Sequence, residues 1–203
     1  MSRRTSDQKI LFGQAHLDAL SAPLAALAGE LERIDRWGRE IAHVLASGGR
    51  LLSAGNGGSA AQAQHLTGEL VGRYRADRIP LSAIALHAET SSFTSIVNDY
   101  GAPEVFARQV RAHGRTGDLL VALSTSGRSA NVVAAAAAGN QIGMTTWALT
   151  GPGANPLADE CDDAICVPTR YVPTVQEIHL IVVHLLCAAV DLQLALSHDR
   201  GGV

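Results

Sequence analysis

Two pairs of polar side chains stand at helical spacing in segments that the sequence predicts as helices. His65 and Glu69 are four residues apart, so on one helix their side chains lie on the same face. Gln176 and His184 are eight residues apart in the segment "VQEIHLIVVHLL", and about two turns of helix let both point into one cleft. Such a set of side chains could bind a divalent metal or a substrate, and imidazole and carboxylate groups could also transfer protons.

The same residues have purely structural explanations. A lone histidine on an apolar helix is more often a hydrogen-bonded core residue than a ligand, and we expect this of His179 more than of His184. Glu69 could be a solvated residue on the surface of its helix. Spacing alone therefore leaves the role of these side chains open.

Three turns rich in small residues could bind an anion. "AGNGGSA", "ALSTSGRSAN" and "ALTGPGAN" each follow an apolar run and lead into a helix-like segment. Glycine lets backbone N–H groups approach a ligand, hydroxyls donate hydrogen bonds, and a helix N-terminus adds positive potential. Such turns also serve chain geometry alone. In "STSGRS", residues 124–129, four of six residues carry hydroxyls, which favours a phosphate ligand.

The first of these turns also matches part of a dinucleotide-binding pattern, because Gly55, Gly57 and Ala60 have the spacing G-x-G-x-x-A. A nucleotide-dependent oxidoreductase would need an acidic residue about 20 positions further on, near the end of the second strand. At that distance "YRAD" lies in or just after a helix-like segment, and the strand-like run "LSAIAL" does not end in an acidic residue. The oxidoreductase interpretation therefore fits poorly.

Short apolar runs alternate with helix-like segments along the chain. The runs predict buried strands at 50–54, 81–86, 118–123, 145–150 and 163–167. The segments between and after them predict helices at 59–74, 91–97, 103–112, 129–138 and about 175–196. This alternation predicts an α/β fold with a doubly wound, five-stranded parallel sheet, in which ligands bind at the carboxyl ends of the strands.

The first 47 residues predict a helical arm before the α/β domain, which we place at residues 48–198. Apolar residues recur at helical spacing from Asp7 to about Ser47, with a break near Ser21 to Pro23. At 203 residues, the whole chain is long enough for one compact domain with a substantial core.

Composition and charge restrict the class of function. The net charge is -3 and the basic residues are scattered, which argues against a nucleic-acid partner. No secretory leader is visible, and the apolar stretch "LIVVHLLCAAVDLQLAL" contains a histidine and an aspartate, which favours a buried helix over a membrane span. Three cysteines without a C-x-x-C pair favour reduced thiols and a cytoplasmic location.

Four segments together carry a family resemblance. "AGNGGSAAQAQHLTGELVGRYRADR", "IVNDYGAPEVFARQV", "GDLLVALSTSGRSANV" and "VQEIHLIVVHLL" resemble, in order and spacing, the phosphoheptose isomerases (sedoheptulose 7-phosphate isomerases) of the sugar-isomerase (SIS) fold. The resemblance covers about residues 40 to 195. It implies conversion of sedoheptulose 7-phosphate to D-glycero-D-manno-heptose 7-phosphate by enediol proton transfer, in a homotetramer whose sites lie at subunit interfaces.

The resemblance also implies roles for particular residues. Glu69 and His184 match the acid/base pair of the family. One zinc ion per subunit would be held by residues matching His65, Glu69, Gln176 and His184. Contacts to the small-molecule sugar phosphate are implied for Asn56, Gly57, Gly58, Ser59, Glu69, Asn98, Asp99, Ser124, Thr125, Ser126, Ser129 and Gln176.

The chain departs from the family pattern at two places. The position three residues before His65 is commonly Asp in the family and is Gln62 here, and an Asp-Thr pair with a following basic residue is replaced by Tyr171–Thr174. Closely similar SIS-fold proteins serve as interaction proteins, including a tetrameric partner of a replication initiator, so a non-catalytic role is the alternative. The presence of all four matching metal ligands favours the isomerase.

Overall fold

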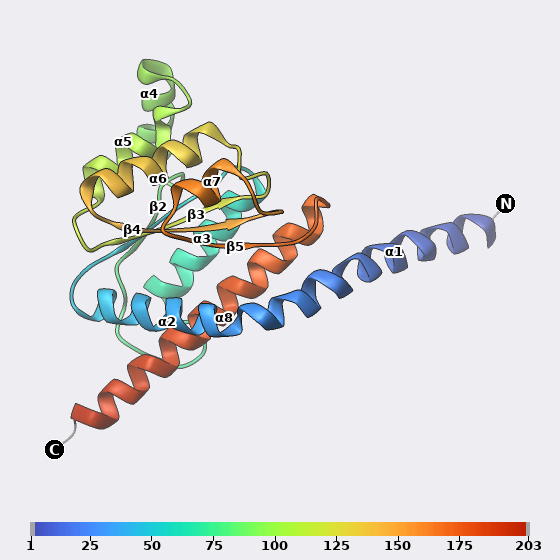
Figure 1. The fold of residues 1–203 in the computed structure, drawn as a ribbon, viewed down its shortest axis with the longest axis horizontal. Helices are drawn as coiled ribbons and strands as arrows, with labels where there is room; N and C mark the ends of the chain where they lie inside the picture. The colour runs from blue at the N-terminus through green and yellow to red at the C-terminus, as the bar shows by residue number, and fades with distance from the viewer. Residues whose placement is uncertain (1–2, 202–203) are drawn as a thin grey trace.

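The computed structural model describes the backbone of residues 3–201 and the side chains of residues 12–196. Five parallel strands form one sheet in the order β2-β1-β3-β4-β5. The strands are β1 (Leu51–Ala54), β2 (Ala83–Ala85), β3 (Leu119–Ser124), β4 (Thr145–Thr150) and β5 (Asp163–Cys166). Each lies inside or overlaps a run that the sequence predicts as a strand, so the doubly wound parallel sheet is confirmed (Figure 1).

Helices cover both faces of this sheet (Figure 1). Alternate residues of β3 point to opposite faces, because successive side chains of a strand alternate. Leu119 and Val121 pack in one core cluster with residues of α2 (Leu31–Ala46), α3 (Gly58–Val71) and α8 (Val172–Gly201). Leu120 and Ala122 belong to the second cluster, with residues of α4 (Thr90–Tyr100), α5 (Glu104–His113), α6 (Ala130–Ile142) and α7 (Pro156–Glu160). The turn "ALTGPGAN" leads into the short helix α7, as the sequence predicts, although α7 is not among the helices predicted from apolar periodicity.

The predicted break in the N-terminal helical segment is wrong in position. Helix α1 (Arg3–Leu27) runs through Pro23, which is buried, and a 3-10 turn at Ala28–Glu30 separates it from α2. A proline removes one backbone donor from a helix, but packing can hold the helix together around it. The 3-10 turn contains Gly29, and glycine has a low helix propensity. Residues 1–2 of the predicted arm lie outside the described residues.

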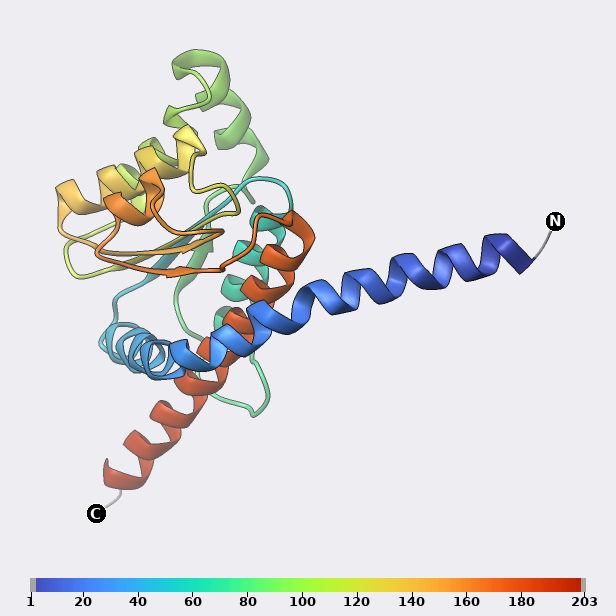
Figure 2. The same ribbon diagram turned by 45° about the vertical axis from the view of Figure 1, so that its right-hand side comes forward.

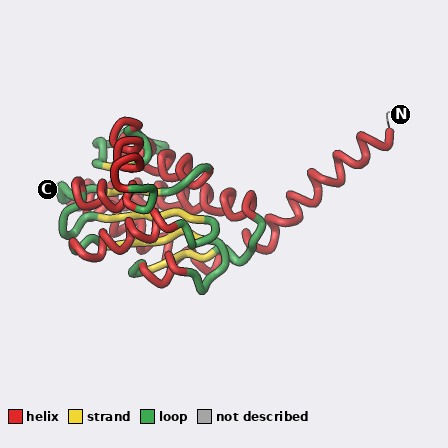
Figure 3. Tube along the Cα trace, turned by 90° about the horizontal axis from the view of Figure 1, so that it is seen from above, coloured by secondary structure: helices red, strands yellow, loops and turns green. Residues whose placement is uncertain are grey.

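The two halves of the predicted arm differ in their surroundings. Helix α1 extends away from the sheet, as seen from the side and from above (Figures 1 and 3). Helix α2 instead buries Ile34, Trp37 and Ile41 in the core, and the Trp37 ring stacks on that of Trp147 in β4 with 4.6 Å between centroids. The α/β core therefore includes α2.

Helix α8 crosses α2 at close range. A Cβ atom added to Gly38 would lie 2.3 Å from the Cβ of Ala189, so glycine is what lets the two backbones approach. By length and composition alone, the Val172–Leu196 part of α8 would suit a membrane span. Val182, Val183 and Leu186 of this stretch are buried in the core, and this packing accounts for the apolar sequence.

Helix α3 runs beside the first half of α8 on the same side of the sheet (Figures 1 and 2). Strand β1 leads into α3, and β3, its neighbour, leads through a turn into α6 on the other face. At the carboxyl ends of β1 and β3, the chain therefore continues to opposite faces of the sheet. Ligands of open parallel sheets bind at such a place.

Candidate active site

The packing of α3 against α8 brings three of the four predicted side chains into contact. His184 Nε2 lies 3.2 Å from His65 Nε2, and His65 Nε2 lies 3.1 Å from Glu69 Oε1. The side chains of His65 and Glu69 are 40% and 23% exposed, so the cluster is open to a ligand and partly desolvated. Two imidazole nitrogens at this distance require one to donate and the other to accept, or a proton or cation between them. The cluster can therefore hold and exchange protons.

Gln176 lies about two turns of α8 away from His184, where α8 meets the beginning of α3. A Cβ atom added to Gly58 would lie 2.4 to 2.7 Å from the amide atoms of Gln176, so the side chain occupies the space that Gly58 leaves. Gln62, where the family commonly has Asp, donates a hydrogen bond from its Nε2 to the backbone oxygen of Gln176. This departure from the family pattern thus joins α3 to α8 beside the candidate site.

The donor atoms partly fit a zinc ion. With bonds of about 2.0–2.1 Å to a tetrahedral zinc, neighbouring donors stand roughly 3.3 Å apart. The 3.1 and 3.2 Å distances that link His65 to Glu69 and His184 are close to this value. Over the described side chains, no group of three His, Cys, Asp or Glu residues is arranged to hold a metal by itself. A complete donor set therefore needs a further ligand such as the amide of Gln176.

The hydroxyl-rich turn after β3 forms a cluster of its own. Ser124 Oγ lies 3.1 Å from Ser129 Oγ and 3.4 Å from Ser126 Oγ. Ser129 is the N-cap residue of α6, so unpaired backbone N–H groups lie directly behind the hydroxyls. This turn has the donors that an anion needs.

The glycine-rich turn after β1 is tied to the neighbouring helix. Asn56 and Asn131 exchange two side-chain hydrogen bonds of 2.9 Å each, one in each direction. Gly57 has a φ of 54°, and the buried Ser59 donates its backbone N–H to the oxygen of Asn56 at 3.0 Å. The turn is thereby held next to the first turn of α6.

Asn98 and Asp99 are not brought to these clusters. Both are exposed residues of α4, and Asn98 donates a 2.8 Å hydrogen bond to Asp99. Helix α4 stands at the outer end of its layer (Figure 1), away from α3 and α8. Between residues 12 and 196, no hydrogen bond joins this pair to the other predicted site residues.

Two residues that support the cluster of His65, Glu69 and His184 were not predicted from the sequence. The ring of Tyr74 stacks on that of His184 with 5.8 Å between centroids. Arg78 is 9% exposed, donates to the backbone oxygens of Glu69 and Leu70, and forms an ion pair with Asp191 at 3.0 Å. Both lie in "GRYRADR", where the sequence offers basic and aromatic residues but no spacing that identifies a partner on α8.

His179 is a core residue, as its position on an apolar helix predicts. It is fully buried, and its Nε2 donates to the backbone oxygen of Thr150 at 3.0 Å. Burial lowers the pKa of His179 to about 4, so the ring is neutral at neutral pH. The next residue in β4's turn, Gly151, donates its N–H to the oxygen of Thr125 at 3.1 Å. His179 therefore supports the turn that carries the hydroxyl cluster.

Comparison with known proteins defines the class first. The family model of the SIS domain matches residues 15–151. A phosphoheptose isomerase structure from Francisella tularensis superposes with a TM-score of 0.84 at 31% identity and covers 92% of this chain and 98% of its own. One from Neisseria gonorrhoeae gives 0.81 at 37% identity, covering 91% and 98%. The protein is an SIS-domain protein.

Sequence similarity defines the family within that class. The phosphoheptose isomerase of Streptomyces coelicolor is 61% identical over 176 residues, which is 87% of this chain and 76% of the relative. The chain therefore belongs to the phosphoheptose isomerase family, whose members are sugar-phosphate isomerases.

Proposed function

We propose that this chain converts sedoheptulose 7-phosphate to D-glycero-D-manno-heptose 7-phosphate, with Glu69 and His184 as the acid/base pair. The observation that carries the proposal is the convergence of Glu69, His65 and His184 where α3 meets α8, at 3.1 and 3.2 Å. Carboxylate and imidazole are the two side-chain types that serve most readily as bases near neutral pH in a partly desolvated site.

The isomerisation requires two proton movements. In this mechanism the carboxylate of Glu69 removes a proton from C1, next to the ketone at C2, and the electron pair moves to form the enediol. His184 transfers the proton between the two oxygens, and Glu69 then returns a proton to C2. The ring stacking of Tyr74 on His184 and the hydrogen bond of Arg78 to the Glu69 backbone hold the two groups in position.

A zinc ion is part of the proposal. His65, Glu69, Gln176 and His184 would hold it, and when bound it would polarise the carbonyl and stabilise the enediolate oxygens. The donor types, two imidazoles, a carboxylate and an amide, are compatible with zinc. Gly58 and Gln62 then act on the site by fixing the place of Gln176.

The sugar phosphate would contact two turns at the edge of the sheet. Ser124, Thr125, Ser126 and Ser129 supply hydroxyls for the phosphate, and the first turn supplies Asn56, Gly57, Gly58 and Ser59 for the sugar. In the single chain, Asn98 and Asp99 belong to α4, which stands at the outer end of its layer, away from α3 and α8 (Figure 1). Their contact with substrate would therefore come through a neighbouring subunit, which agrees with the proposed homotetramer.

We also place the enzyme in the cytoplasm. The thiols of Cys161, Cys166 and Cys187 are free, which suits a reducing compartment.

A coupled assay with sedoheptulose 7-phosphate tests this function. Purified full-length protein should form heptose 7-phosphate, lose that activity on treatment with a chelator, and regain it with zinc. A protein that shows no turnover with zinc added, and that captures a replication initiator protein, would instead be the non-catalytic interaction protein.

A further inference from the structure

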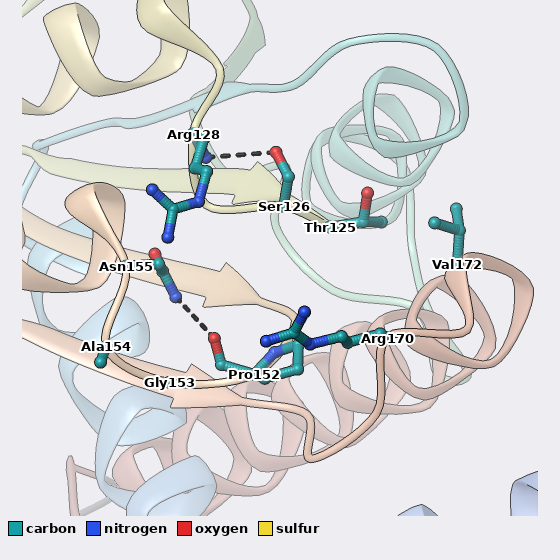
Figure 4. A pocket seen from close by; sticks show the side chains of 9 residues that line it. All are labelled: Thr125, Ser126, Arg128, Pro152, Gly153, Ala154, Asn155, Arg170 and Val172. Atoms are coloured by element: carbon teal, nitrogen blue, oxygen red, sulfur yellow. Dashed lines mark hydrogen bonds between the residues drawn. The ribbon is translucent and has the colours of Figure 1, made fainter.

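Two arginine side chains face an open pocket beside the hydroxyl-rich turn. The pocket has a volume of about 290 Å³ and lies between residues 125–128, the turn after β4 and the segment before α8. Arg128 and Arg170 enter it from two sides (Figure 4). Its lining residues are Thr125, Ser126, Arg128, Pro152, Gly153, Ala154, Asn155, Arg170 and Val172.

This pocket lies beside the hydroxyl cluster described above and overlaps it only at Ser126. None of the four proposed zinc ligands lines it, and neither do Ser124 and Ser129. It shares only Thr125 and Ser126 with the residues that the family resemblance assigns to sugar-phosphate contacts. Its chemistry is therefore not explained by the proposed acid/base pair or by the Ser124–Ser129 hydroxyl pair.

Neither guanidinium has a partner within the described part of the chain. Arg128 takes part in a hydrogen bond through its backbone N–H, to Ser126 Oγ at 3.2 Å, and its side chain in none. No hydrogen bond or ion pair is formed by Arg170 between residues 12 and 196, and none of the pocket's lining residues is an Asp or a Glu. In a chain of net charge -3, this pocket is a local concentration of unneutralised positive charge.

The pocket is preformed, because hydrogen bonds join the turn after β3 to the turn after β4, and these two turns form opposite walls of the pocket. Gly151 donates to the oxygen of Thr125 at 3.1 Å, and Leu157 donates to the oxygen of Gly127 at 3.0 Å. Gly127 has a φ of 62°, and a Cβ atom there would lie 1.9 Å from Asn155 Oδ1. The Asn155 side chain is itself held by bonds to Thr150 and Pro152. The arginines therefore extend from fixed backbone.

We propose that Arg128 and Arg170 bind a phosphoryl group in this pocket. The planar guanidinium presents paired donors that match the oxygens of a phosphoryl group, and Thr125 and Ser126 add hydroxyl donors. Two guanidiniums on opposite sides suit a dianion, which neutralises both. The phosphoryl group belongs either to the sugar substrate or to a separate phosphorylated molecule, and the identification of the first source rests on the proposed function.

Selenate, a tetrahedral dianion with an anomalous signal, tests the site in crystals of the full chain. We expect an anomalous peak within hydrogen-bond distance of both guanidiniums in the unaltered protein. Arg128→Gln with Arg170→Gln should lose this peak. Arg39→Gln is the matched control, because Arg39 is an exposed arginine of α2 that pairs with Asp35, and it should keep the peak. Absence of the peak in the unaltered protein, or its persistence in the double variant, would overturn the proposal.

Steady-state kinetics then identify the source of the phosphoryl group. If it is the phosphate of the substrate, the double variant raises KM roughly tenfold or more with little change in kcat, because charge-assisted bonds to bound phosphate are lost. If it belongs to a separate molecule, KM is unchanged although the selenate peak is lost. Both results support the site. Lack of turnover by the unaltered protein would contradict the proposed function and leave the selenate result to judge the pocket.

Discussion

At the scale of single residues, Gly58 controls the position of Gln176. Gly58→Ala would put a methyl group 2.4 to 2.7 Å from the amide of Gln176, so that side chain must move. Because the amide is the end of a flexible side chain, the fold should tolerate the change. We expect the melting temperature to stay within a few degrees, whereas kcat/KM falls roughly 10- to 100-fold and zinc binding weakens.

Gly68→Ala is the matched control in the same helix. A Cβ atom at Gly68 meets nothing within 4 Å, so alanine there should stabilise α3 by about 0.5–1 kcal/mol and leave activity unchanged. Equal kinetic effects of the two substitutions, measured with thermal melts on the same preparations, would show that Gly58 has no particular role.

His179 should make stability depend on pH. Its pKa is lowered to about 4 in the folded protein, while the unfolded chain has the ordinary value near 6.5. Between these values the unfolded state binds more protons, so the free energy of unfolding falls as the pH falls from 6.5 toward 4. The contribution lost by pH 5 is about 2 kcal/mol, from 1.36 kcal/mol per pKa unit.

His179→Gln keeps a donor for the Thr150 oxygen and removes the titrating ring. Urea unfolding at pH 7 and pH 5 should therefore show a smaller loss of stability in the variant than in the unaltered protein. Parallel losses in the two proteins would mean that His179 does not account for the effect.

At the scale of elements, apolar periodicity and turn residues were sufficient to predict the sheet. The runs that form β1, β3 and β4 are almost entirely buried, which leaves a continuous apolar signal, and the half-buried edge runs form β2 and β5. The break between α1 and α2 was misplaced because Pro23 is a strong local signal that packing overrides. Helix α7 has five residues, too few for a periodic pattern.

The crossing of α2 and α8 leaves no room for a Cβ atom at Gly38. Gly38→Ala would place two Cβ atoms 2.3 Å apart, and neither belongs to a flexible side chain. Overpacking of this kind costs about 1–3 kcal/mol, so the midpoint of urea denaturation should fall. Gly29→Ala, where a Cβ meets nothing within 4 Å, should not lower it. A Gly38→Ala protein as stable as the parent would mean that the helices separate without cost.

At the scale of the whole molecule, α1 presents large apolar side chains to solvent. Phe12, Leu17 and Leu24 are 77%, 59% and 48% exposed in the single chain. The proposed homotetramer would bury such residues, since burying apolar surface drives subunit association. Light scattering should give a mass of four 21.2 kDa chains, and Leu17→Asp with Leu24→Asp should give a smaller species. A monomeric parent protein would contradict the assembly.

The clustering of candidate site residues could be predicted from sequence where spacing along one helix, or the composition of one turn, carries the information. His65 and Glu69 share a face of α3, and Gln176 and His184 both lie on the side of α8 that meets it. Contacts across separate loops leave no such spacing. Arg128 and Arg170 face each other across a pocket because two separate turns are packed together, and this arrangement is visible only in the folded structure.

The central claim is that Glu69 and His184 transfer protons during isomerisation. It is tested most directly by measuring kcat for sedoheptulose 7-phosphate in Glu69→Gln and His184→Gln, with thermal melts of each. Because a positioned acid or base contributes about 10²- to 10⁴-fold, each variant should lose that factor in kcat while its melting temperature stays close to that of the parent. Near-parental kcat in both folded variants would contradict the account.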